Sequence, residues 1–153
     1  MATASPLYST DILRLAVAAG LHGRLTSPDA TAQGRTPVCG SSITLDLTLD
    51  DNGCIERIGM DLHACAMGQA AAQIFASGAI GRDHAALADA EQGLRGWLNT
   101  VQQGLPDWPG IEALAVVRPY PARHEAVLLP FRVGAEAVAQ GAEYRASMGN
   151  IRA

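Results

Sequence analysis

The segment SITLDLTLDDNGCIERIGMDL, residues 42–62, carries the clearest structural pattern of the chain. Apolar and polar side chains alternate through its first half, and the apolar ones are Ile43, Leu45, Leu47 and Leu49. The sequence DDNG at residues 50–53 then favours a turn, and a looser apolar pattern continues to Leu62. Alternation with a period of two is typical of strands, and a turn between two such runs predicts a β-hairpin. We therefore expect an antiparallel sheet built around this hairpin.

Helical patterns flank the hairpin on both sides. Apolar residues recur at helical spacing in residues 8–19, small apolar residues fill 64–77, and a third amphipathic pattern follows the capping candidate Asp83. Residues 24–37 are rich in turn formers and have no apolar period, so we expect an ordered loop there.

A last helix is expected from about residue 125 to about residue 140, and Pro130 restricts its start. Proline costs a helix little only in the first turn, so this helix begins no earlier than about residue 125. His124 and Glu125 then lie at its N-terminus. The 153 residues suit one domain, 1–153, and the elements predict an α+β fold with a small antiparallel β-sheet packed against several α-helices.

Composition excludes several classes of function. A net charge of −4 and a pI near 5.4 argue against nucleic acid as a partner. All eleven basic residues are arginine, which excludes a lysine phosphate loop, a Schiff base and a catalytic lysine. No apolar run approaches the roughly 20 residues of a membrane span, and the first residues lack a secretory pattern, so we expect a cytoplasmic protein without membrane partners.

Three cysteines are the first candidates for chemistry, because an odd number in the cytoplasm argues against a disulfide framework. Cys65 stands directly before a helix, where backbone N–H groups favour a thiolate, although a lone cysteine is more often a buried apolar residue. Cys39 approaches the first hairpin strand at an exposed place, which favours a functional role. Cys54 follows the turn beside acidic residues and is interpreted as structural.

Two polar residues at the start of the last helix are further candidates. His124 could be a metal ligand, a proton donor or an ordinary polar residue. Glu125 could be an oxygen ligand or a first-turn acid that the helix dipole stabilises. The residues alone leave these alternatives open.

Four segments together resemble one known family. LYSTDIL (7–13), TPVCGSSITLDLTLDDNG (36–53), HACAMGQAAA (63–72) and RHEAVLLPF (123–131) resemble the iron–sulfur cluster assembly scaffold family of IscU, NifU N-terminal and SufU proteins. The resemblance spans nearly the whole chain and implies a SufE/NifU-like fold. The long interval between Cys65 and the last helix is closest in spacing to the SufU branch.

The resemblance also implies a ligand set, with two departures from the family's pattern. Cys39 and Cys65 match the first two family cysteines, whereas Ser41 stands where the family has an aspartate and Glu125 where it has a third cysteine. His124 resembles a histidine that some members place just before that cysteine. The implied site holds a transient 2Fe–2S cluster, iron or zinc on Cys39 and Cys65, completed by His124, Glu125 and Ser41. Replacing Glu125 by cysteine is then expected to raise cluster occupancy.

As a function, the resemblance implies a scaffold or carrier for iron–sulfur cluster assembly that is not itself an enzyme. One alternative is a zinc-dependent sulfurtransferase of the SufU type that accepts persulfide from a cysteine desulfurase. Another is a metal-free degenerate scaffold that acts as a binding module. The implied partners are the desulfurase and other assembly proteins, and two chains could share a cluster as a homodimer. VVRPYPAR (116–123) replaces the family's chaperone-recognition motif, which argues against an Hsp70-type chaperone as partner.

Overall fold

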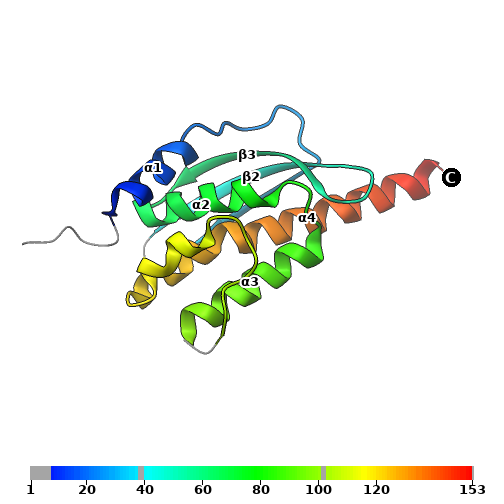
Figure 1. Ribbon diagram of the computed structural model, residues 1–153. Helices are drawn as coiled ribbons and strands as arrows, with labels where there is room; N and C mark the ends of the chain where they lie inside the picture. Colours follow the sequence, from blue (N-terminus) through cyan, green and yellow to red (C-terminus); the bar gives the residue numbers. More distant parts are fainter. Residues whose placement is uncertain (1–7, 38–39, 101–102, 153) are drawn as a thin grey trace, which may run out of the picture.

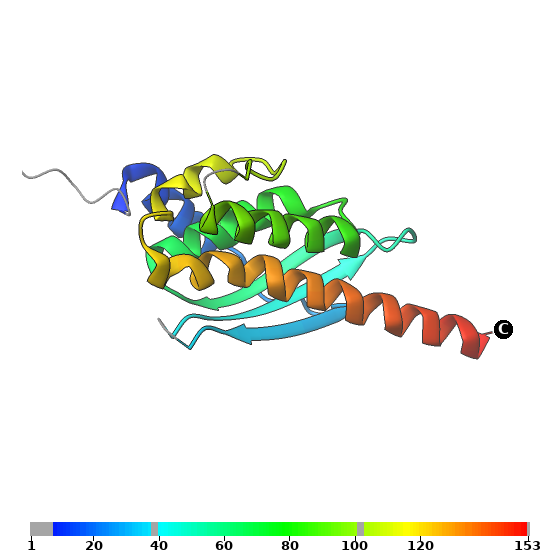
Figure 2. The ribbon, with the colours of Figure 1, turned by 90° about the horizontal axis from the view of Figure 1, so that it is seen from below.

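The computed structural model describes residues 8–37, 40–100 and 103–152 of the chain. Its elements in chain order are α1 (Thr10–Ala19), β1 (Ala30–Arg35), β2 (Ser42–Leu49), β3 (Ile55–His63), α2 (Ala66–Ala79), α3 (His84–Asn99), the 3₁₀ helices η2 (Ile111–Val117) and η3 (Pro121–Arg123), and α4 (His124–Arg152). The strands form one antiparallel sheet in the order β1-β2-β3. Helices α2 and α4 cover one face of this sheet, and α3 packs outside them against α4 (Figures 1 and 2). The expected α+β fold is confirmed.

The predicted hairpin is formed by β2 and β3. Leu45 pairs with Met60 and Leu47 with Ile58, and both leucines are fully buried beneath the helices. Asp50 closes the turn, because its carboxylate accepts hydrogen bonds from the backbone N–H groups of residues 52 and 54. Alternation therefore marks the face of the sheet that the helices cover, as the pattern predicts.

The prediction of a loop over residues 24–37 is wrong for its second half, because residues 30–35 form strand β1, which pairs with β2. Ala30 and Ala32 are its buried residues, and both are too small to produce a visible apolar alternation. Gly34 lies directly under α4, where an added Cβ would come within 2.3 Å of the Val133 side chain. The alternate residues of β1 that face α4, Ala30, Ala32 and Gly34, are thus small because α4 crosses the strand closely.

Helix α4 is longer than predicted and contains Pro130 in its second turn. Proline cannot donate the helical hydrogen bond to the carbonyl of Ala126. The helix continues because its neighbours Leu129, Phe131 and Val133 are almost completely buried, so tertiary packing outweighs the local cost. Its last turns project beyond the sheet (Figure 2), whereas the sequence predicted an end near residue 140.

Helix α2 is the most enclosed helix of the pair that covers the sheet. Ten of its fourteen residues are buried. Gln69, Gln73 and Ser77 are the partly or fully exposed residues that continue, at intervals of four, the line that starts at Cys65. Gln73 hydrogen-bonds His22 Nε2 at 2.9 Å through Oε1 and donates to Ser77 Oγ at 3.3 Å. This line of polar side chains is called the α2 polar line below.

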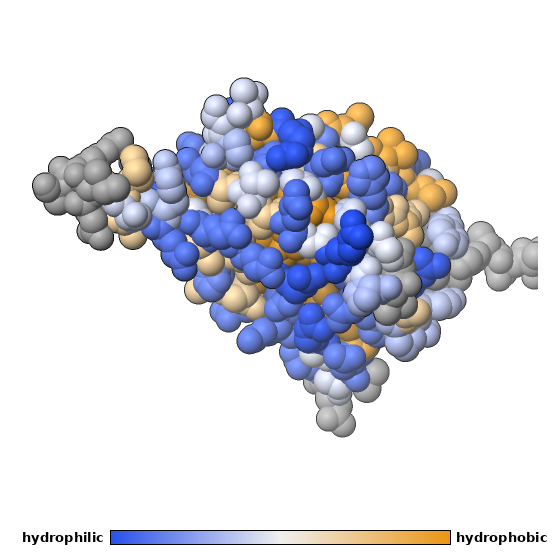
Figure 3. Space-filling model, turned by 180° about the vertical axis from the view of Figure 1, so that it is seen from behind, coloured by the Kyte–Doolittle hydropathy of each residue, from blue (hydrophilic) through white to orange (hydrophobic). Residues whose placement is uncertain are grey.

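On the other face of the sheet, Asp46 of β2 is fully buried. Its carboxylate accepts hydrogen bonds from Arg24 Nε at 2.6 Å, the Thr31 hydroxyl at 2.6 Å and the Leu25 backbone N–H at 3.0 Å. These bonds tie the segment that follows α1 to the sheet. Seen from behind, the molecule presents a mostly hydrophilic face (Figure 3). Within the described ranges, no helix is long and apolar enough to cross a membrane.

Candidate functional site

The segments that carry the candidate residues meet at one end of the molecule. Ser42, the first residue of β2, pairs with His63 at the end of β3, and Cys65 follows two residues later. A Cβ added to Gly68 in the first turn of α2 would lie 3.6 Å from the Cβ of Ala126. The start of α2 and the start of α4 are therefore neighbours, as Figures 1 and 2 show.

Cys39, the first predicted ligand, lies outside the described residues. The connection that contains it is closed around its ends: the Thr36 N–H donates to the Ser41 carbonyl at 2.8 Å, and the Ser41 N–H donates to the Thr36 hydroxyl at 3.1 Å. Ser41 is 1% exposed and Thr36 2%. Thr36 and Ser41 are thus buried and joined by two hydrogen bonds, and metal ligation by Ser41 stays a prediction.

Cys65 is the N-cap residue of α2, as the sequence predicts. Its backbone is extended, its side chain makes no capping hydrogen bond, and its thiol is free of any disulfide and half-buried. Its carbonyl accepts from the Gln69 N–H at 2.9 Å, so the first helical turn fixes its position. The thiol therefore stands at the N-terminal end of α2, where the first backbone N–H groups have no partner within the helix.

His124 is oriented by backbone carbonyls. Its Nε2 atom lies 3.1 Å from the carbonyl oxygen of Val117 and 3.1 Å from that of Arg118. Carbonyl oxygens only accept hydrogen bonds, so Nε2 carries a hydrogen, and Nδ1 holds the lone pair of the neutral ring. Metal-binding histidines characteristically donate their second ring N–H in this way. The Arg118 guanidinium in turn stacks 4.5 Å above the Trp97 ring of α3.

Glu125 is paired with helix α3. Its Oε1 atom lies 2.8 Å from Nη1 of Arg95, whose Nη2 atom lies 3.3 Å from Oε1 of Glu91. The hydrogen bond to Glu125 is the main cause that raises the pKa of Arg95, and burial opposes it. The Glu125 carboxylate therefore already has a cationic partner on α3.

Ala126, which sequence reasoning did not select, is the first-turn residue that faces α2. It is 2% exposed, and its neighbour across the helix contact is Gly68, which has no side chain. Arg95 was also missed, because its partner Glu125 lies thirty positions away and no local pattern connects the two. The i,i+4 spacing of Glu91 and Arg95 is the only trace of this cluster that the sequence displays.

Of the predicted ligands, the thiol of Cys65 and Nδ1 of His124 belong to the helix starts that meet at this end, and Glu125 is paired with Arg95. Sulfur and imidazole nitrogen are ligands that suit zinc and iron. Across residues 8–37, 40–100 and 103–152, no group of three or more His, Cys, Asp and Glu residues is arranged to hold a metal ion. The predicted site consequently depends on a further donor from Cys39.

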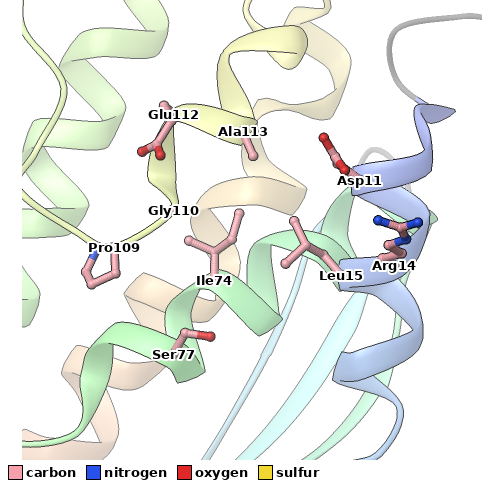
Figure 4. Close-up of a pocket in the computed structure, with 9 residues that line it drawn as sticks. All are labelled: Asp11, Arg14, Leu15, Ile74, Ser77, Pro109, Gly110, Glu112 and Ala113. Carbon is pink, nitrogen blue, oxygen red and sulfur yellow. The ribbon is translucent and has the colours of Figure 1, made fainter.

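A separate cavity of about 520 Å³ lies between α1, α2 and η2 (Figure 4). Leu15, Ile74 and Ala113 form apolar walls, and the Asp11 and Glu112 carboxylates lie on opposite sides of it. Ile74 belongs to the second half of α2, away from the end that Cys65 caps. This cavity is therefore distinct from the candidate site.

Comparison with known proteins identifies relatives of the structure. No protein-family model matches the chain, and no curated protein matches it. Among solved structures, the N-terminal part of a nitrogen-fixing NifU-like protein from Brucella abortus is 29% identical and has a TM-score of 0.78, covering 91% of this chain and 96% of that one. A protein from Fervidobacterium islandicum, described as an iron–sulfur cluster assembly scaffold (SufU) for the SUF system, is 21% identical with a TM-score of 0.76, covering 89% and 99%.

Proposed function

We propose that this chain, whose fold is similar to those of a NifU-like protein and a SufU scaffold and whose sequence resembles the family's motifs except at Ser41 and Glu125, is an iron–sulfur cluster assembly scaffold that holds iron or a nascent cluster as its cargo. One observation carries the proposal: Cys65, whose thiol makes no capping hydrogen bond, stands at the start of α2, next to the start of α4 and to the β1–β2 connection. The similarity to a SufU scaffold of the SUF system supports the assembly role.

The ligand chemistry follows from the positions of the donors. Cys65 provides a sulfur ligand at the start of α2, and Cys39 provides a second from the connection between β1 and β2. His124 provides Nδ1, because its Nε2 hydrogen is engaged by two carbonyls. Two thiolates and one imidazole bind iron less tightly than three thiolates do, which suits a cargo that has to be passed on.

The proposed sulfur donor is a cysteine desulfurase. In that step the terminal sulfur of the desulfurase persulfide is attacked by the Cys65 thiolate, the sulfur–sulfur bond of the donor breaks, and the desulfurase thiolate leaves. The product is a persulfide on Cys65, and no further oxidant is needed. Transfer that requires bound zinc and is not followed by cluster assembly would favour the zinc-dependent sulfurtransferase over the scaffold.

A metal-free binding module is the rival function. The Arg95–Glu125 ion pair favours this rival, because the pair engages the carboxylate of Glu125, one of the predicted ligands. Metal and acid-labile sulfide content of protein purified without oxygen separates the two. We expect stoichiometric iron or zinc in the wild type and its loss in Cys39→Ser and in Cys65→Ser.

Cys54→Ser is the matched control, because Cys54 lies after the β2–β3 turn and burial, together with Asp50 and Asp83, raises the pKa of its thiol. It is expected to retain wild-type metal content. If Cys65→Ser also retains that content, or if the wild type holds none after iron and sulfide are supplied, the scaffold proposal is wrong.

A further inference from the structure

We propose that the outer face of α1 is a docking surface for a second copy of this chain, so that two chains associate through an antiparallel pair of α1 helices. The surface consists of exposed apolar side chains on α1 and of three charged side chains beside them. Helix α1 lies at the periphery of the molecule, where another chain can approach it (Figures 1 and 2). The inference stands apart from the proposed function.

The first support is that α1 is apolar on both faces. Three residues of its inner face are buried: Ile12, Ala16 and Ala19. Leu13 and Val17, one turn apart on the outer face, are 46% and 70% exposed. With Tyr8 and Leu21, four of the eight exposed large apolar side chains of the described residues lie within residues 8–21. In Figure 3 apolar side chains gather at the upper right, on the side where α1 lies.

The second support is a set of charges that no contact within the chain uses. Asp11 and Arg14 project from α1, and Glu112 of η2 lies across the cavity between α1, α2 and η2 (Figure 4). All three are exposed, and none has a side-chain hydrogen bond or ion pair with any residue that the structure describes. On its other side, Arg14 borders a hollow of about 330 Å³ that Leu13 and Val17 also line.

The third support is that this surface is complementary to itself. A two-fold axis repeats every contact, because a contact from one residue to another also occurs in reverse. Two antiparallel α1 helices can therefore place Asp11 of each chain level with Arg14 of the other. In the same register the two Leu13 side chains meet near the axis, and Val17 lies level with Tyr8. One register thus joins opposite charges and apolar side chains, which favours a second copy over an unrelated protein.

The cavity gives Arg14 of the second copy a defined place. An arginine side chain combines an apolar stem with a charged guanidinium. The stem can cover the apolar wall that Leu15 provides, and the guanidinium can reach the carboxylates of Asp11 and Glu112 on opposite sides of the cavity. Complementary charges across an interface fix its register and disfavour other registers.

The test is analytical ultracentrifugation of the whole chain. A contact made chiefly by one ten-residue helix stays below the roughly 800 Å² per partner of stable complexes, so the dimer should be weak. The weight-average mass should rise from 15.9 kDa toward twice that value between about 10 μM and about 1 mM chain. A chelator and a reductant are present throughout, so that neither a shared metal nor a disulfide joins two chains.

Charge reversal tests the ion pairs. Asp11→Arg and Arg14→Asp should each raise the dimer Kd by at least about tenfold, because like charges then oppose each other across the axis. An equimolar mixture of these two variants should associate again, because each chain offers the charges that the other lacks. A variant that is merely misfolded cannot give this rescue, and circular dichroism verifies the fold of each variant.

Val17→Asn tests the apolar contact and should also raise the Kd by at least about tenfold. Ile80→Asn is the matched control, because Ile80 is 54% exposed at the end of α2 and does not belong to the docking surface. It should associate like the wild type. Cys65→Ser should do so too, which separates this inference from the proposed function: loss of metal binding in that variant leaves association unchanged.

Three results would overturn the inference. The first is a wild type that stays at 15.9 kDa up to about 1 mM, which would leave the surface to a different protein. The second is a mixture of Asp11→Arg and Arg14→Asp that associates no better than either variant alone. The third is association that Val17→Asn leaves intact or that Cys65→Ser abolishes.

Discussion

A third thiolate introduced at Ala126 should convert the candidate site into a stronger metal site, whereas one introduced at Glu125 should not. The sequence resemblance assigns the missing cysteine to position 125, but in the structure that side chain points to Arg95 on α3. Position 126 faces the first turn of α2, beside the residue that follows Cys65 by three positions. The prediction therefore separates two adjacent positions by their directions alone.

The cost of Ala126→Cys follows from its surroundings. The site is 2% exposed, and adding an atom to a packed core costs typically about 1–3 kcal/mol. Here the facing residue is Gly68, whose missing Cβ would lie 3.6 Å from the Cβ of Ala126, so the sulfur atom enters space that a side chain would otherwise fill. We expect a loss of about 1 kcal/mol in the free energy of unfolding of the metal-free protein.

The gain should exceed that cost once metal is bound. A soft thiolate added to the proposed set is expected to lower the cobalt or zinc Kd by at least tenfold, or about 1.4 kcal/mol. Cobalt titration is the assay, because the thiolate-to-cobalt charge-transfer absorbance rises with the number of coordinating sulfurs. Glu125→Cys is the matched control. A larger absorbance for Glu125→Cys than for Ala126→Cys would refute the reasoning, since it would mean that position 125 faces the metal.

Two further predictions concern the fold. Gly78→Ala should lower the free energy of unfolding by about 2 kcal/mol, because the new Cβ would lie 2.4 Å from Nε1 of the buried Trp108. Gly96→Ala is the control and should cause no such loss, because its new Cβ meets the flexible side chain of Gln103. Denaturant unfolding measures both variants, and equal losses would contradict the packing described. Burial opposes ionisation of Asp46, yet the hydrogen bonds to its carboxylate lower its pKa below the ordinary 3.8. The ionised carboxylate therefore stabilises the fold above pH 3.8, and this stabilisation is lost as the pH falls through the folded-state pKa. Asp46→Asn should remove this part of the acid dependence, and unchanged acid unfolding would speak against it.

The sequence predicts those elements whose signal is local. The β2–β3 hairpin alternates with a period of two, and α3 begins at Asp83, whose side chain accepts from the Ala86 N–H as a capping residue should. The position of Cys65 before α2 is equally local. The resemblance to the NifU and SufU family is confirmed by the structural neighbours.

The parts that sequence reasoning missed depend on contacts between distant segments. The residues of β1 that face α4 are small, and the strand forms because it pairs with β2 and because α4 passes closely over Gly34. The length of α4 depends on packing that outweighs Pro130. At the site, the direction of Glu125 is set by Arg95, and this contact exists only after α3 has packed on α4. No pattern within either helix specifies it.

The α2 polar line gives another protein a surface to contact beside Cys65. Most other residues of α2 are buried, and the start of α4 lies against its first turn at Gly68. One accessible surface beside the thiol therefore runs along Gln69, Gln73 and Ser77, next to the end of α1. If sulfur is delivered to Cys65 and cargo is later withdrawn from it, a delivering protein and a receiving protein that both contact this surface compete for it. Delivery and withdrawal would then exclude each other in time.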